Sequence, residues 1–186
     1  TERGYDGAER LQMLGVANSA LSALCVLLRK DAPHSPELAF DCTQQNSKVK
    51  KDLQFTDTDA AAIADALVAN TRVAALSITN DAHALTAAGF GAIASLVDER
   101  RGYSALTALN FTANGLQSKA TKALAKALRE NCSVVHLCLD CNPIGDKAIA
   151  ALARALARNR SITSLSLANC ALTPGGAGAL ATALSS

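Results

Sequence analysis

Apolar residues in the second half of the chain follow one pattern three times. Each copy reads L-x-x-L-x-L-x-x-N/C-x-L, with Val, Ile or Phe at some leucine positions, and the copies begin at Leu106, Val134 and Ile162. The alternation in the middle of the pattern is typical of a short strand that buries one face. The sequence therefore predicts strands at 109–111, 137–139 and 165–167, which recur every 28 residues.

The segments between the copies carry the periodicity of amphipathic helices. Each has apolar residues at positions i, i+1 and i+4, which form one stripe on a helix. These stripes are Leu124, Ala125 and Leu128; Leu152, Ala153 and Leu156; and Leu180, Ala181 and Leu184. Helix starts are indicated by Ser118, Asp146 and Thr173, and helix ends by Asn131 and Asn159, where a left-handed residue is tolerated.

Two weaker copies of the unit precede the clear ones. The apolar opening at Val73 predicts a strand at 76–78, and counting back by the same spacing predicts a helix over 57–70 and a strand at 38–40. Each strand is thus followed by a helix, as in a repeat protein whose single units cannot bury their own apolar faces.

The N-terminal part departs from the repeat. The polar residues 41–54 predict an inserted, exposed loop between the first strand and its helix. The apolar segment 8–30 predicts a helix that covers the first strand, because the terminal units of solenoids need a cap. We expect one domain that spans 1–186.

The repeat spelling resembles the ribonuclease-inhibitor class of leucine-rich repeats. This long-helix type is also found in NOD-like receptors, in Ran GTPase-activating protein and in the C-terminal half of tropomodulin. The resemblance implies an α/β leucine-rich repeat solenoid, a right-handed β-α superhelix of about five repeats. It places a parallel sheet on the concave side and the helices on the convex side.

Composition agrees with a globular domain. Of the 186 residues, 49% are hydrophobic and 18% charged, which argues against disorder. The apolar run at 16–28 is interrupted by polar residues and is too short to span a membrane. No targeting segment is evident, so we expect a cytoplasmic protein. Because the chain starts at Thr1 instead of Met, we expect it to be a piece of a longer protein.

Candidate metal and catalytic residues are few. Cys138 and Cys141 form a C-x-x-C with His136 before them and Cys170 in the next repeat. Zinc needs four ligands, and the aligned strand neighbours supply none, so we expect reduced thiols with no metal and no cofactor. Cys170 occupies the N/C position of the repeat, where it should satisfy the turn backbone.

No residues point to an enzyme. The histidines lack a serine or cysteine nucleophile and a carboxylate in a reliable arrangement. The glycines Gly175, Gly176 and Gly178 lack the G-K-[ST] ending of a phosphate loop. Close helix packing explains Gly176 better. We therefore expect neither catalysis nor a small-molecule substrate.

Charge is concentrated in the third and fourth units. Residues 116–160 carry eight basic and three acidic side chains. The basic positions align across the 28-residue repeat and predict a ladder on the convex helices: Lys119, Lys122, Lys126, Arg129, Lys147, Arg154 and Arg158. Most stripes of this kind are solvated helix faces. The functional interpretation of the ladder is docking to an acidic protein or to a phosphate surface. Nucleic acid is not favoured, because aromatic residues are only 3% of the chain and its net charge is +2.

The concave face is predicted to carry small, mostly uncharged side chains. Those with polar groups are Asn110, Thr112, His136, Asp140 and Ser166. None is a Trp, Tyr or Arg anchor of the kind that dominates binding energy at interfaces. The usual inference that the hollow of such a fold binds a partner is therefore weaker here than the fold suggests, and the sequence leaves open whether the concave or the convex face binds.

These observations favour a non-enzymatic protein-interaction or scaffold module. Two alternatives rest on the resemblance alone: a cytoskeletal, actin-capping domain like that of tropomodulin, and a GTPase-activating protein of the Ran type. The strand at 165–167 would be the outer edge of the sheet. Exposed edges promote pairing, so we expect either further repeats or a homodimer through the C-terminal edge.

Overall fold

The computed structural model describes residues 11–13, 18–30, 37–41, 55–79, 85–98 and 105–185. Strands and helices alternate throughout these residues. The strands are β1 (Leu11–Met13), β2 (Glu37–Asp41), β3 (Ala75–Thr79), β4 (Ala108–Asn110), β5 (His136–Cys138) and β6 (Ser164–Ser166). The helices are α1 (Asn18–Arg29), α2 (Asp57–Leu67), α3 (Ala87–Leu96), α4 (Ser118–Leu128), α5 (Asp146–Leu156) and α6 (Pro174–Leu184).

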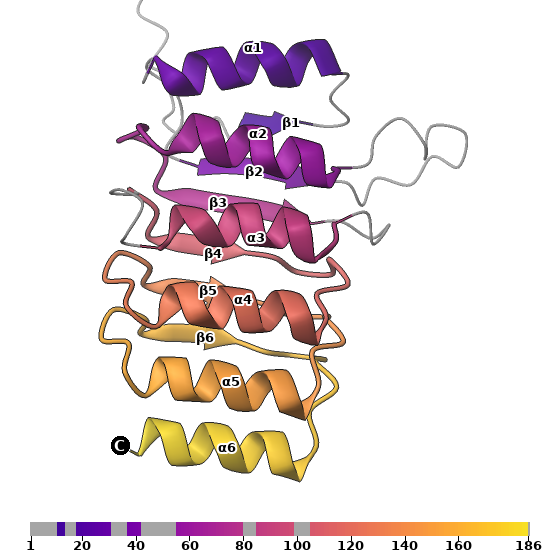
Figure 1. The fold of residues 1–186 in the computed structure, drawn as a ribbon, viewed down its shortest axis with the longest axis vertical. Coiled ribbons are helices and arrows are strands. Elements are labelled where there is room, and N and C mark those ends of the chain that lie inside the picture. The colour runs from indigo at the N-terminus through magenta and orange to yellow at the C-terminus, as the bar shows by residue number, and fades with distance from the viewer. Residues whose placement is uncertain are drawn as a thin grey trace, which may run out of the picture.

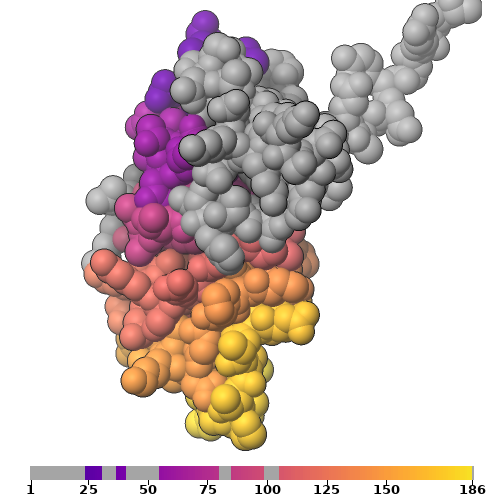
Figure 2. Space-filling model, turned by 90° about the vertical axis from the view of Figure 1, so that its right-hand side faces the viewer, coloured from indigo at the N-terminus to yellow at the C-terminus, as the bar shows by residue number. Residues whose placement is uncertain are grey.

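The strands form one parallel sheet in chain order, from β1 to β6. The helices lie side by side in a second layer, and the units succeed one another along the long axis of the molecule (Figures 1 and 2). Framework leucines lie opposite each other in the ladder, with Leu76 beside Leu109, Leu109 beside Leu137, and Leu137 beside Leu165. The predicted β-α solenoid and its five strands are confirmed.

The core lies between the sheet and the inner faces of the helices. The expected stripe is buried in α2, through Ile63, and in α4 and α5, through Leu124 and Leu152. The stripe of α6 differs, because Leu184 is 73% exposed. Strand β6 is the last strand of the described sheet, so the face of α6 away from α5 has no further unit against it within the described residues.

A buried asparagine joins the turns of consecutive units. The side-chain oxygen of Asn142 accepts the backbone N–H groups of Asn114 (3.0 Å) and Leu116 (2.9 Å) in the preceding unit. Its amide nitrogen donates to the carbonyls of Phe111 (2.8 Å) and Leu139 (2.7 Å). One side chain therefore satisfies backbone groups that would be costly to bury unpaired.

The flanking units place Asn114 and Cys170 at the same position. Asn114 donates to the carbonyl of Thr112 at 3.2 Å, and the Cys170 thiol donates to the carbonyl of Leu139 at 3.1 Å. The predicted role of Cys170 in the turn is confirmed. Burial raises the pKa of this thiol, which keeps it protonated and able to donate.

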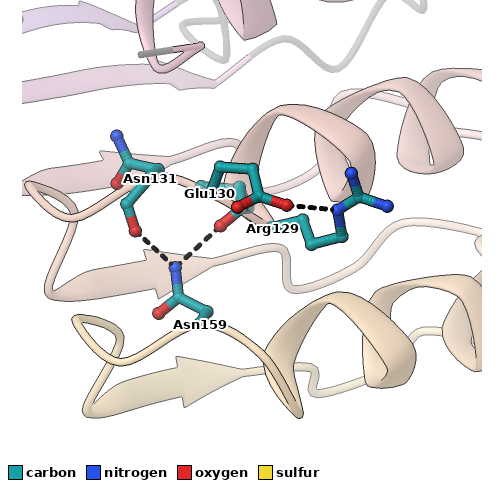
Figure 3. A network of polar contacts seen from close by, with 5 residues as sticks. Arg129, Glu130, Asn131 and Asn159 are labelled. Carbon is teal, nitrogen blue, oxygen red and sulfur yellow. Dashed lines mark hydrogen bonds and ion pairs between the residues drawn. The ribbon is translucent and has the colours of Figure 1, made fainter.

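A second asparagine series follows the helices. Asn159 donates to the carbonyls of Leu128 (2.7 Å) and Asn131 (2.8 Å) (Figure 3). Its side-chain oxygen accepts the N–H of Ile162 at 2.8 Å. Asn131 makes the equivalent bond to the carbonyl of Val97 at 3.0 Å. The expectation of left-handed backbone at Asn131 and Asn159 is wrong, because neither has a positive φ. These positions require asparagine for the hydrogen bonds that its side chain makes with the backbone, and not for a left-handed backbone conformation.

Neighbouring helices also meet through their first residues at two places. Asp57 of α2 accepts the N–H of Thr86 (2.8 Å), and Asp146 of α5 accepts the N–H of Thr173 (3.0 Å). A Cβ on Gly176 would lie 2.5 Å from a carboxylate oxygen of Asp146. Close packing therefore explains this glycine, as expected.

The N-terminal expectation needs correction. The helix expected over 8–30 begins only at Asn18, and Leu11–Met13 forms strand β1, paired in parallel with β2. The residues of β1 alternate apolar and polar, which is typical of a strand. The edge of β2 provides the backbone groups with which β1 pairs. The loop expected over 41–54 starts after Asp41, which belongs to β2; its remaining residues lie outside the described ones. Within the described residues, none of the helices is long and apolar enough to cross a membrane.

Replacing the framework leucines with alanine tests the register. Leu137 is 2% exposed in the middle of the sheet, whereas Leu165 is only partly buried at its edge. Leu137→Ala should lower the free energy of unfolding by about 2–5 kcal/mol through cavity formation. Leu165→Ala should cost less, because solvent already reaches that site. Urea unfolding of both variants measures the difference; equal losses would contradict this assignment of the edge.

Candidate protein-interaction surfaces

A groove of about 350 Å³ runs between α4 and α5 on the helical face of the solenoid. Its lining consists of long cationic side chains and alanines: Lys122, Ala125, Lys126, Arg129, Ala151, Arg154, Ala155 and Arg158. We call this feature the basic groove. It forms because α4 and α5 pack side by side and because the 28-residue repeat places Lys126 and Arg154 at equivalent positions.

The basic groove brings together five of the seven residues of the predicted ladder. Lys119 and Lys147 lie on the same helices, near their N-termini, but do not line it. No carboxylate is among the lining residues. Such a concentration of one sign of charge in a concave surface raises the local potential and attracts anionic partners.

Among the described residues, Arg129 is the one cation of the lining that forms an ion pair. Its Nε lies 2.8 Å from the carboxylate of Glu130 (Figure 3), and both side chains are about half exposed. An exposed ion pair of this kind contributes little free energy, so Arg129 can exchange Glu130 for a carboxylate of a partner. Among the described residues, Lys122, Lys126, Arg154 and Arg158 form no ion pair.

The alanine floor of the basic groove was not anticipated from the sequence. Ala125 and Ala155 are buried and Ala151 is half-buried. Small residues there leave a depression between the two rows of cations. The spacing of Ala151 and Ala155, four residues apart, places them on one helix face and could have indicated the floor. Small residues at this spacing also allow close helix packing, so the pattern alone does not predict a groove.

A second groove, of about 480 Å³, lies over α3 and is chemically different. Its lining is rich in alanine and includes Gly91, Asp65, Asp98 and, at one side, Lys126. Asp65 is paired with Arg29 of α1 at 2.5 Å. The two grooves therefore differ in charge: the basic groove has five cations and no carboxylate, whereas the groove over α3 has two carboxylates and one cation.

Polar side chains on the strand face bind one another. Asn110 accepts the Thr112 hydroxyl at 2.7 Å, and that hydroxyl lies 3.3 Å from the Cys138 sulfur. The Ser166 hydroxyl donates to Asp140 at 2.7 Å. Of the five predicted concave residues, the structure thus groups Asn110 with Thr112 and Asp140 with Ser166. His136 is exposed and belongs to neither pair.

The cysteines near this face form no recognisable metal centre. Within the described part of the chain, no group of three or more His, Cys, Asp or Glu side chains is placed to hold a metal ion. The described cysteines, among them Cys138, Cys141 and Cys170, are free thiols.

Comparison with known proteins agrees with this geometry. The profile of the Leucine Rich repeat family matches residues 130–153 and 158–181, which include β5, part of α5, β6 and part of α6. Together with the parallel strand-helix architecture, this match identifies the repeating unit. The chain contains leucine-rich repeats. A sequence search of curated proteins finds no match.

Solved structures share the fold of this leucine-rich repeat protein. One, described as "Leiomodin-1 Actin-Binding Site 2 (ABS2)", has 18% sequence identity and a TM-score of 0.69, and the alignment covers 91% of this chain and 90% of that one. Another is the tropomodulin C-terminal domain of Caenorhabditis elegans, with 15% identity, a TM-score of 0.66, and coverage of 89% and 91%. At these identities the likeness shows the fold.

The carboxylate of Asp140 provides a test of the strand-face contacts in this leucine-rich repeat protein. The hydrogen bond from Ser166 lowers the pKa of Asp140 below its ordinary 3.8, and the N–H of Ala168 adds to the effect. Because this pKa is lower in the folded state than in the unfolded state, the ionised carboxylate stabilises the fold at pH values above the ordinary pKa. This stabilisation is lost as the pH falls through the folded-state pKa. Ser166→Ala should raise the pKa of Asp140 toward 3.8, as measured by NMR titration of its carboxyl carbon. An unchanged titration would show that the Ser166 contact does not form.

Proposed function

We propose that this leucine-rich repeat protein is a non-enzymatic interaction module that binds an acidic surface of another protein through the basic groove. The observation that carries the proposal is the lining itself, which has five cations and no carboxylate. Arg154 and Arg158 suit this task, because a guanidinium can bind a carboxylate with two parallel hydrogen bonds. The strand face supports the choice, since its polar groups Asp140 and Ser166 already bind each other.

Charge reversal in the basic groove tests the proposal with poly-L-glutamate as the acidic probe. Lys126→Glu combined with Arg154→Glu should weaken binding by at least about tenfold, or about 1.4 kcal/mol. Wild-type affinity should fall as salt rises, because exposed charges are screened. Fluorescence anisotropy measures both effects, and thermal melts confirm that the variant folds.

The matched control is Lys119→Glu combined with Lys147→Glu. It makes the same change in net charge on the same two helices, outside the basic groove. Glutamate near a helix N-terminus is favourable, so this variant should fold and keep most of its binding. Equal losses in both double variants would show that net charge, and not the groove, attracts the probe.

A cytoskeletal role is the second candidate. It is favoured by the structural likeness to the leiomodin-1 actin-binding site and the tropomodulin C-terminal domain, which extends over about nine tenths of each chain. On this proposal the protein acts in the cytoplasm, associated with actin. The Ran-type alternative and a homodimer through the edge strand β6 stay predictions.

Co-sedimentation with filamentous actin tests the cytoskeletal candidate. If this chain binds the filament, a saturable fraction should enter the pellet with actin and remain in the supernatant without it. The Lys126→Glu, Arg154→Glu variant then decides whether the basic groove takes part. A chain that stays in the supernatant at actin concentrations of tens of micromolar would contradict the candidate.

A further inference from the structure

The shape of the basic groove narrows the class of its acidic partner. We propose that its occupant is an α-helix of the partner protein, which lays a ridge of small or apolar residues on the alanine floor and places carboxylates on both sides of that ridge. The inference rests on the proposed function of the basic groove and specifies the conformation of what binds there.

The spacing of the cations is the first argument. Lys122, Lys126 and Arg129 follow each other at intervals of four and three residues along α4, and Arg154 and Arg158 are four apart on α5. At 1.5 Å per residue these steps are about 6 and 4.5 Å along a helix axis. Carboxylates at i, i+4 and i+7 of a partner helix repeat the same steps. An extended segment presents side chains on one face every 6.6 Å or so, which fits the shorter step less well than a helix does.

The floor is the second argument. Ala125, Ala151 and Ala155 offer methyl groups and no polar side chain between the two rows of cations. A purely charged segment would lose hydration there without gaining a hydrogen-bond partner, which is unfavourable. A ridge of alanine or leucine buries apolar surface instead. Small floor residues also let a third helix approach to the usual interaxial distance of about 8–10 Å.

The basic groove lacks the features that phosphate ligands use. Its floor lies in the interior of α4 and α5, where backbone N–H groups are bound within the helices, so it offers no free donors of the kind found at helix N-termini. The lining contains no aromatic residue, whereas single-stranded nucleic acids depend on aromatic stacking. Only flexible cationic side chains would contact a phosphate.

The length of the walls sets the length of the occupant. Helices α4 and α5 each have 11 residues, or about 16 Å at the standard rise. Two to three turns of a partner helix would fill this length, which corresponds to roughly 8–11 residues. A helix this short is marginal in water, so we expect the segment to fold as it binds.

Three synthetic peptides of 16 residues test the inference. The first carries an alanine and leucine stripe flanked by two rows of glutamate. The second has the same sequence with two central alanines replaced by proline, which prevents the helix but keeps the charge. The third has the composition of the first in an order that spreads glutamate over all helix faces.

The striped peptide should bind at least about tenfold more tightly than the proline peptide, because only it can supply the ordered conformation. It should also bind more tightly than the spread peptide, and its circular dichroism should become more helical when the protein is added. If the proline peptide binds as well as the striped one, the helical occupant is excluded while acidic binding stands. If neither these peptides nor poly-L-glutamate bind, the proposed function fails as well.

A larger side chain on the floor of the basic groove tests the role of its shape, because it leaves the charge of the groove unchanged. Ala151→Leu places a larger apolar side chain in the basic groove, whereas Ala150→Leu places one beside it on the same helix; both alanines are half-buried. Ala151→Leu should weaken the striped peptide about tenfold and leave poly-L-glutamate binding nearly unchanged. Ala150→Leu should change neither. Retention of the striped peptide by Ala151→Leu, or equally tight binding of an oligothymidylate to the wild type, would overturn the proposal.

Discussion

The buried side-chain amide of Asn142 joins one turn of the central solenoid to the turn before it. Asn142 accepts two backbone N–H groups from the unit that contains Asn114 and donates to the carbonyls of both units. Removal of such a side chain leaves buried backbone groups without partners, which costs more than the bonds themselves contribute. This requirement places a hydrogen-bonding side chain at the same position of three consecutive units, Asn114, Asn142 and Cys170, and so reinforces the 28-residue register of the sheet.

The register decides which surface residues become neighbours. Because Leu109, Leu137 and Leu165 are aligned across three strands, residues 28 positions apart lie on adjacent helices at equal height. Lys126 and Arg154 are such a pair. The folding constraint acts on the inward leucines and asparagines and leaves the outward positions free. Cations on both walls of the basic groove are therefore not required by the fold, which is the physical basis for assigning them a role in binding.

The sequence predicted the fold where the pattern of leucines is regular. The five strands from β2 to β6 and the buried stripe of α4 follow from periodicity alone, since inward positions are spaced by backbone geometry. Prediction failed where tertiary partners decide the conformation. The three residues of β1 become a strand because β2 offers an unpaired edge, and Asn131 acts through bonds to Val97 in the previous unit. The basic groove was foreseen as a row of charges but not as a hollow, because its depth depends on the packing of two helices.

The two faces of the solenoid therefore differ in how their polar groups are used. On the strand face, residues 26 positions apart, such as Asp140 and Ser166, satisfy each other, so a partner would have to displace existing hydrogen bonds. On the helical face, Lys122 and Arg158 have no carboxylate partner among the described residues. A partner with carboxylates would form new ion pairs there and would displace water instead of existing hydrogen bonds. This difference supports the proposal that a partner docks on the helical face and not on the strand face.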